Sequence, residues 1–593
     1  MLTRFDGLLK KYQALSSWLL MLVAVIIYQG VLSCGFVSDD VEQILQNPFV
    51  KNSHLWRRIF EGRVWSFAGG LSQTNFYRPL HIFSYWLVCR VAGLNPFAYH
   101  SLQLILYALS VWIVYRLGRK LLQNDLAAFA GALLWALHPL HVEAVAWAAA
   151  IPEIGCALFC LLGFWMFLRA EDHSPASFPW HAAAAAVYFP ALFFKEMAFS
   201  FPLLLLAYWF CYPSAESWFR RALHWLPYVA AVVVCVVIRV TVMGNFSGTS
   251  PLRNVNSQVA WAAVGLLGQH AKLFFWPFNL SEFRDFDLTA SLRSPWPWLT
   301  LLVLVVACLG RHREPRVSFL VLWWFVMLLP CLNFHHLSVP LVADRFSYLP
   351  SVGLCLALGY LTFGWAPLHF PNKYLAGVAV TALAAVAVLW AAQTVRTIPH
   401  WHDNDALSRY ALRVSPNAAE VHAFHGVALQ FQERDFDGAA REFRTALRLN
   451  AQSLQPSPAV TYNSYIGLGQ VALNQGREPE ALDYFNQAVH LMPNSDFAYN
   501  VLGSVYFPQG DYARAAEYFE QAVRVNPQDL GARFFLGTCW MKLGKPTQAA
   551  GEFRAAREVD PDYFQAYEAE ARALEAAGDQ AGAAEVRRLM AQH

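Results

Sequence analysis

The chain has 593 residues, of which 56% are hydrophobic and only 14% are charged, and its mean hydropathy is +0.32. A soluble protein of this length would carry about a quarter charged residues, which excludes a wholly soluble fold. The net charge of +3 is too small to indicate a nucleic-acid partner. Charged residues are sparse up to about residue 395 and dense beyond it. This distribution predicts a polytopic membrane domain followed by a soluble domain.

Apolar runs of about 16–22 residues predict about eleven membrane spans. They lie near residues 14–34, 98–117, 124–140, 151–169, 180–194, 198–212, 222–243, 296–310, 317–333, 351–366 and 374–393. The first run follows basic residues, as in a signal peptide, but its length and the many runs after it favour a span. Two further stretches, Gln258–Phe278 and Leu80–Val91, are interrupted by polar residues. We expect them to be re-entrant or to lie at the membrane interface.

Basic residues set the orientation of the spans, because Lys and Arg favour the cytoplasmic side. Those that flank the runs fall on one side if the N-terminus is cytoplasmic: Lys10, Lys11, Arg116, Arg119, Lys120, Arg169, Arg220, Arg221, Arg311, Arg313, Arg316 and Lys373. An odd number of spans then places the C-terminal domain in the periplasm or the ER lumen. Many alanines and short loops favour a bacterial inner membrane over the ER membrane.

On this topology the outer side of the membrane collects a distinctive polar set. It contains Asp39, Asp40, Arg78, His138, His141, Glu143, Lys195, Glu196, Glu282, Arg284, Asp285, His335, His336, Asp344 and Arg345. Ionisable residues near membrane depth usually mark a pathway or a site. The outer side is therefore where we expect a functional site.

The C-terminal part shows an internal repeat. Gly469, Gly503 and Gly537 recur every 34 residues, and three further sets keep the same period: Gly476, Gly510, Gly544 and Gly578; Ala481, Ala515, Ala549 and Ala583; Phe485, Phe519 and Phe553. A 34-residue period of this kind is typical of tetratricopeptide repeats, which stack as an α-solenoid. The predicted organisation is a membrane domain over 1–395, a linker helix over 396–419 and four to five repeats over 420–593. Such repeats indicate a protein partner or a rigid scaffold.

The adjacent acids Asp39 and Asp40 follow the first span and have three interpretations. One carboxylate could act as a general base that takes a proton from an acceptor hydroxyl. The pair could hold a divalent cation, Mg²⁺ or Mn²⁺, that neutralises a phosphate. It could also simply cap the helix expected from Val41 onward.

The other outer residues also admit structural and functional roles. Arg345 suits a phosphate because a guanidinium stays charged and matches phosphate oxygens, but it could instead pair with Asp344 at the interface. Lys195 and Glu196 lie between two spans and could form an ion pair within the hairpin. Arg78 could orient the first loop or contact a donor.

His138 and His141 lie close to Glu143, but their spacing is not that of a zinc protease. No nucleotide-binding glycine motif occurs in a credible context. An outer-side site without a nucleotide cradle suits a lipid-linked donor.

Several stretches resemble the transmembrane and tetratricopeptide-repeat-containing O-mannosyltransferases and their bacterial relatives. They are the stretches 39–47, 77–80, 93–100, 138–145, 195–196 and 344–351, in that family's order. The resemblance implies an all-α GT-C membrane fold. It also implies transfer of a sugar, mannose above all, from a polyprenyl-phosphate donor to Ser or Thr of exported proteins.

Site roles follow from the same resemblance. Asp39 or Asp40 becomes the catalytic base or acceptor-binding acid, Glu143 a second acid, and Arg345 the contact to the lipid phosphate. Arg78 and Lys195 are further phosphate-binding candidates, and His138, His141, Glu196 and Asp344 are other site candidates. Two alternatives stay open: a transferase acting on lipid or envelope polysaccharide, and a non-enzymatic membrane-anchored scaffold.

Overall fold

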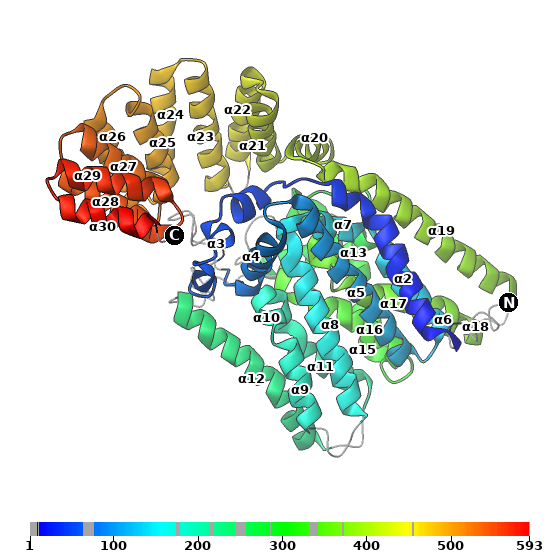
Figure 1. Cartoon of the computed structure of the whole chain (residues 1–593). Coiled ribbons are helices and arrows are strands. Elements are labelled where there is room, and N and C mark those ends of the chain that lie inside the picture. Colours follow the sequence, from blue (N-terminus) through cyan, green and yellow to red (C-terminus); the bar gives the residue numbers. More distant parts are fainter. Residues whose placement is uncertain are drawn as a thin grey trace. The chain divides into compact units, whose positions relative to one another are not determined.

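The computed structural model describes residues 9, 11–62, 64, 76–172, 178–213, 217–243, 257–284, 286–332, 342–369, 373–453 and 456–591. Over these residues the chain is helical and contains no strand, as the sequence predicted. It divides into two compact units. Unit 1 comprises Met1–Val41 with Tyr77–Ser415, and unit 2 comprises Glu42–Phe76 with Pro416–His593 (Figure 1).

Unit 1 is a bundle of apolar helices. In chain order these are α2 (Gln13–Tyr28), α4 (Pro79–Ala92), α5 (Pro96–Leu122), α6 (Asp125–Leu137), α7 (Val142–Ala146), α8 (Ile151–Glu171), α9 (Phe178–Tyr188), α10 (Ala191–Phe194), α11 (Phe201–Cys211), α12 (Trp218–Met243), α13 (Ser257–Phe275), α14 (Leu288–Arg293), α15 (Trp296–Gly310), α16 (Pro315–Leu328), α17 (Ser351–Tyr360), α18 (Ala366–His369), α19 (Lys373–Thr397) and α20 (Asn404–Val414).

Seven helices among the described residues are long and apolar enough to cross a membrane, which supports an integral membrane protein. They cover Gln13–Ser33, Pro96–Leu122, Ala148–Glu171, Trp218–Met243, Pro315–Leu332, Ser351–His369 and Tyr374–Trp401. The pair Asp125–Leu137 and Pro139–Ala146, bent by 51°, is an eighth if counted as one span. The remaining predicted runs coincide with shorter apolar helices, so the count of eleven spans is not confirmed.

The bend between α6 and α7 follows from the sequence His138-Pro139. Proline lacks a backbone donor, and its ring disfavours the helical conformation for the residue before it. His138 accordingly has an extended backbone, with ψ 126°. Close helix packing nearby depends on small residues: a Cβ added at Gly359 of α17 would lie 2.7 Å from the backbone nitrogen of Gly131 of α6.

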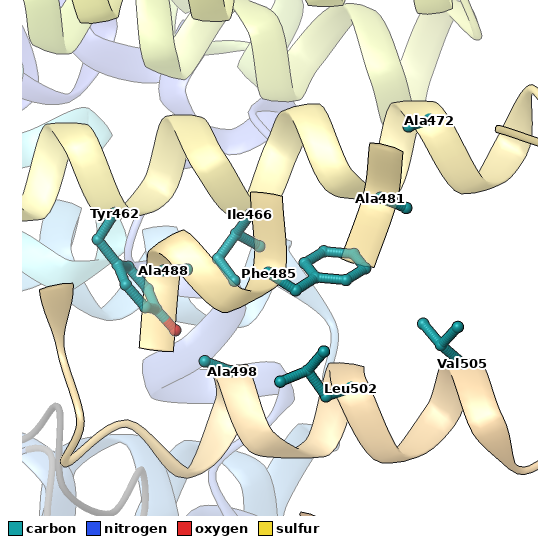
Figure 2. Packing of buried hydrophobic residues seen from close by; sticks show 9 residues of the cluster. All are labelled: Tyr462, Ile466, Ala472, Ala481, Phe485, Ala488, Ala498, Leu502 and Val505. Carbon is teal, nitrogen blue, oxygen red and sulfur yellow. The ribbon is translucent and has the colours of Figure 1, made fainter. Parts of the chain in front are cut away.

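Unit 2 contains paired helices that stack in chain order. They are α21 (Ala419–Ala428), α22 (Phe436–Gln452), α23 (Pro458–Asn474), α24 (Glu478–Leu491), α25 (Asp496–Tyr506), α26 (Tyr512–Val525), α27 (Leu530–Lys542), α28 (Pro546–Val559), α29 (Phe564–Ala576) and α30 (Gln580–Ala591). The short helix α3 (Pro48–Lys51) of the first polar loop also belongs to this unit. Figure 2 shows one packing layer, in which Phe485 of α24 meets Ile466 of α23 and Leu502 of α25.

The repeated glycines and phenylalanines form contacts within each repeat. A Cβ added at Gly503 or Gly537 would lie 2.8 Å from the ring of Phe519 or Phe553, so the phenylalanine ring occupies the space above the glycine. The second set of repeated glycines occurs for a different physical reason. Gly476, Gly510, Gly544 and Gly578 all have positive φ, between 72° and 87°, where glycine ends the first helix of each pair without strain.

The loop that follows Asp40 belongs to unit 2 from Glu42 onward. Within that unit, Asn52 Nδ2 donates a hydrogen bond of 2.6 Å to Asp560 Oδ1, which lies between α28 and α29. Asn52 Oδ1 accepts from the amide of His54 at 2.8 Å. The first polar loop is thus tied by a side-chain hydrogen bond to the repeats.

Replacing Gly503 by valine should destabilise unit 2 by about 1–3 kcal/mol, because the added side chain meets the buried Phe519 ring. The matched control is Gly551→Ala in α28, where an added Cβ has nothing within 4 Å. Because alanine favours a helix over glycine by about 0.5–1 kcal/mol, the control should be neutral or stabilising. The temperature at which a protease first cleaves the repeats measures both. A Gly503→Val chain as resistant as wild type would contradict the packing described.

Candidate active site

Asp40 is fully buried and bonded to two backbone amides. Its Oδ2 accepts from Val37 N at 3.0 Å, and its Oδ1 accepts from Ala149 N at 2.5 Å. Burial raises the pKa of Asp40 well above its usual value, although these amide donors oppose the change. The bonded amides belong to the loop before Asp40 and to the turn before α8, not to the helix that follows. Asp40 therefore fastens the first loop to the start of α8 and is not a helix cap.

Asp39 differs from its neighbour because its side chain is only half-buried. It follows Ser38, whose φ of 50° is in the left-handed region that non-glycine residues rarely adopt. The Ser38 amide is held by a 2.7 Å hydrogen bond to Asn404 Oδ1. Strained residues of this kind cost about 1–3 kcal/mol and concentrate at functional sites. The strained turn directs two adjacent carboxylates to different environments.

Glu143 and Arg345 form the centre of a buried ionic cluster. Arg345 is bonded to Glu143 both through its side-chain Nη1 and through its backbone amide, which lies 2.9 Å from Oε2. The guanidinium also lies over the Trp147 ring, 4.9 Å from its centroid. The carboxylates around it raise the pKa of Arg345 despite its burial. The guanidinium therefore stays charged and is held in one orientation.

Glu153 extends this cluster. Its Oε1 lies 3.3 Å from Arg345 Nε and also pairs with Lys195 Nζ. Glu153 and Lys195 are both buried, and the Lys195 ammonium lies 4.8 Å from the centroid of the Phe346 ring. Four residues thus alternate in charge: Glu143, Arg345, Glu153 and Lys195. In the sequence, Glu153 is an acid at the start of an apolar run, and our prediction did not include it among the site residues.

A second cluster joins Arg78, Glu196 and Arg239. Glu196 Oε2 accepts from Arg78 Nε at 3.0 Å and from Nη2 at 2.5 Å, while its Oε1 accepts from Arg239 Nη1 at 3.0 Å. Lys195 and Glu196 therefore pair with other residues and not with each other. Our sequence prediction also missed Arg239, although an arginine within an apolar run is a usable signal.

Asp344 and Glu282 line a narrow cavity with Glu143. Asp344 Oδ1 accepts from Arg284 Nη2 at 3.1 Å, so Asp344 pairs with Arg284 and not with Arg345. Burial raises the pKa of Glu282 well above its usual value, with Arg345 opposing and Glu143 adding to the rise. Burial likewise raises the pKa of Asp344, with Arg284 opposing. Protonation of such acids lowers the negative charge of the site.

His138 and His141 are fully buried among other groups. His141 Nε2 lies 3.0 Å from Ser351 Oγ, and His138 packs against Trp390 with ring centroids 4.0 Å apart. The His138 Nδ1 accepts from the amide of Leu140 at 3.2 Å. These contacts give both histidines structural partners. Asp285, His335 and His336 lie outside the described residues.

The surroundings of Asp39 and Asp40 test whether this pair could hold the predicted divalent cation. Both carboxylate oxygens of Asp40 accept backbone N–H groups, which fixes the carboxylate in place and leaves fewer of its lone pairs for a cation. A cation at this pair would therefore rely on Asp39. Because Asp40 is fully buried and Asp39 is half-buried, the two carboxylates fit a shared metal site poorly.

Comparisons with known proteins agree with the two-part organisation. Residues 78–241 match the family described as dolichyl-phosphate-mannose-protein mannosyltransferase. Residues 425–496, 500–556 and 541–589 match tetratricopeptide repeats. The first match spans Arg78, Glu143, Glu153, Lys195, Glu196 and Arg239.

Curated relatives are similar to the chain over most of its length. A protein O-mannosyl-transferase of Caenorhabditis elegans is 23% identical over 68% of this chain and 58% of its own length. Protein O-mannosyl-transferase TMTC3 of Homo sapiens is 24% identical over 79% and 54%, and human TMTC1 is 25% identical over 71% and 54%. The chain spans about half the length of these relatives. Among solved structures, the crystal structure of MamA covers 29% of this chain and 90% of its own, with 21% identity and a TM-score of 0.26.

The fold and the matched segments define an integral membrane protein with tetratricopeptide repeats and a region similar to dolichyl-phosphate-mannose-protein mannosyltransferases. The resemblance seen in the sequence is confirmed, because the chain matches both a mannosyltransferase family and tetratricopeptide repeats and is similar to proteins named protein O-mannosyl-transferases.

Alanine at Asp40 should lower the stability of the protein, because it leaves the amides of Val37 and Ala149 without their acceptor. A buried unsatisfied group costs about 1–3 kcal/mol. Asp39→Asn should change stability by less than about 1 kcal/mol, since the half-buried side chain keeps its shape. The midpoint of heat-induced aggregation in detergent measures both variants. Equal midpoints for the two would contradict the division of roles.

Proposed function

We propose that the chain transfers mannose from a polyprenyl-phosphate donor to serine or threonine hydroxyls of exported proteins. The observation that carries this proposal is the half-buried Asp39 on the same unit as the buried Glu143–Arg345–Glu153–Lys195 cluster. An acid and a fixed cation are the two groups that such a transfer requires. The mannosyltransferase match of residues 78–241 and the names of the similar O-mannosyl-transferases support the choice of sugar and acceptor.

Asp39 is the base in this proposal. Asp40 cannot easily take part because both its oxygens are bonded to amides and its position is fixed. Asp39 accepts the proton of the acceptor hydroxyl as the hydroxyl oxygen forms a bond to the anomeric carbon. The bond between that carbon and the phosphate oxygen breaks at the same time, and its electron pair leaves with the lipid phosphate.

Arg345 stabilises the departing phosphate. Its Nη1 pairs with Glu143 and its Nε pairs with Glu153. Among the described contacts none involves Nη2, so this nitrogen can donate to an incoming phosphate oxygen. A cation held in place before the reaction needs no reorganisation as charge develops, which is the main benefit of electrostatic catalysis. Lys195 also pairs with Glu153, so the charge of that acid is shared between two cations and does not fully neutralise Arg345.

The repeats orient the acceptor in this account. The loop that begins two residues after Asp40 belongs to the same unit as the repeats, and the Asn52–Asp560 hydrogen bond joins the two. A polypeptide bound along the repeats would therefore be held by the same unit as the loop that begins just after the proposed base. The basic residues beside the spans favour a cytoplasmic N-terminus, and with an odd number of spans we expect the repeats and the site in the periplasm or lumen.

Asp39→Asn should lower transfer of radiolabelled mannose from polyprenyl-phosphate-mannose to protein by about 10²–10⁴-fold, the usual contribution of a general base. Arg345→Lys should lower it by about 10²–10³-fold, because the lysine cannot keep the contacts to both acids while meeting the phosphate. The assay uses membranes containing equal amounts of inserted protein.

Glu314→Gln, at the start of α16 and outside the site, is the control and should transfer at the wild-type rate. Unchanged transfer by Asp39→Asn would exclude Asp39 as the base. Label that appears only in lipid or glycan would favour the other acceptor class. Wild type without label from any lipid-linked sugar would favour the scaffold.

The role of the repeats can be tested by exchanging the two residues of the Asn52–Asp560 hydrogen bond. Asn52→Asp places two carboxylates together at the Asp560 contact and should lower transfer to protein severalfold while leaving transfer to a short peptide unchanged. Adding Asp560→Asn restores a carboxylate–amide pair with the two residues exchanged and should recover transfer to protein. Comparing transfer rates for the two acceptors measures this. Equal losses for protein and peptide, or no recovery in the double variant, would contradict acceptor orientation through this bond.

A further inference from the structure

A second group of ionisable side chains lies outside the candidate active site. Glu171 at the end of α8, His181 in the first turns of α9 and His224 in the first turns of α12 come together. One potential ligand atom of each lies within 4.8 Å of the other two. In the helical bundle α9 lies beside both α8 and α12 (Figure 1). Three helices thus contribute one potential ligand each.

The separation of two of these atoms fits metal coordination better than a direct bond. His181 Nε2 lies 3.4 Å from Glu171 Oε1, yet it forms no hydrogen bond of acceptable geometry. Two ligands at about 2.0–2.1 Å from a tetrahedral Zn²⁺ are about 3.3 Å apart. The nitrogen and the oxygen are therefore spaced as neighbouring ligands of one ion.

The outer atoms of the same two side chains are held as they are in metal sites. Tyr228 Oη lies 3.3 Å from His181 Nδ1, and Trp209 Nε1 donates to Glu171 Oε2 at 3.1 Å. A metal-binding histidine usually bonds through its other ring nitrogen to a second residue, and ligating carboxylates are held in the same way. These bonds orient His181 Nε2 and Glu171 Oε1 toward each other.

The two histidines are suited to be neutral ligands. His181 is fully buried and His224 is 5% exposed, and their rings stack with centroids 4.5 Å apart and planes at 22°. Two protonated imidazoles at this distance would repel each other in a poorly solvated site. Neutral imidazoles with a carboxylate are a ligand set that zinc accepts, with a fourth position for water.

We propose that Glu171, His181 and His224 bind a Zn²⁺ that joins α8, α9 and α12. The ion is not part of the catalytic site, because Glu171 and Glu153 are separated by about 27 Å along α8. The ion would stabilise the packing of α12, a largely exposed helix that also carries Arg239, the partner of Glu196. A three-ligand ion at one end and the Arg239 pair further along would hold α12 against the bundle.

The test is the zinc content of the full chain, purified in detergent without chelator and measured by mass spectrometry. Wild type should carry about one Zn²⁺ per chain, and His181→Ala and Glu171→Gln should carry less than a fifth of that. His490→Ala, an exposed histidine of α24, is the matched control and should keep the metal.

A second measurement uses wild-type protein alone, so it does not depend on whether a variant folds. Chelation should lower the unfolding temperature of the purified chain, and Zn²⁺ should restore it while Mg²⁺ does not. Wild type without zinc and without a thermal shift on adding Zn²⁺ would overturn the proposal. Zinc retained by His181→Ala and Glu171→Gln at the wild-type level would also overturn it.

Discussion

Charge burial is the constraint on which unit 1 depends. An isolated charge inside an apolar bundle costs several kcal/mol, so each acid and base near the site needs an opposite partner. The structure meets this requirement with two ionic clusters, one around Arg345 and one around Glu196. Removing one partner of a buried pair costs about 3–5 kcal/mol, more than the intact pair contributes. Loss of activity in a variant of these residues therefore needs a parallel measure of folding.

The same clusters bear on how a site rich in acids would receive the anionic phosphate of the proposed donor. Burial raises the pKa values of Asp40, Glu282 and Asp344, which favours the neutral form of these acids. Arg345 keeps its charge because two carboxylates surround it. The strained turn at Ser38 leaves Asp39 more exposed than Asp40. The site is thus arranged around one fixed cation and one accessible acid.

Much of the fold could be predicted from the sequence because its periodicities are strong. The 34-residue spacing of glycine and phenylalanine reflects contacts such as Gly503 with Phe519, and the repeats are confirmed. Apolar runs located the helices, but length and composition alone could not decide which of the shorter ones span the membrane.

Ion-pair partners could not be predicted in the same way, because contacts between distant segments leave no local pattern. Lys195 and Glu196 are adjacent in sequence but bond to Glu153 and Arg78. Nor could the sequence separate Asp39 from Asp40, since the difference depends on the amide of Ala149, more than a hundred residues away. The catalytic roles of these residues stay predictions.

The proposed transfer is a single displacement in which Asp39 removes the proton and Arg345 receives the phosphate. The most direct measurement is the anomeric configuration of the transferred sugar, compared with that of the donor by NMR of the isolated product. One direct attack on the anomeric carbon predicts inversion of that configuration. Retention would mean two successive displacements through a covalent intermediate, and it would contradict the mechanism.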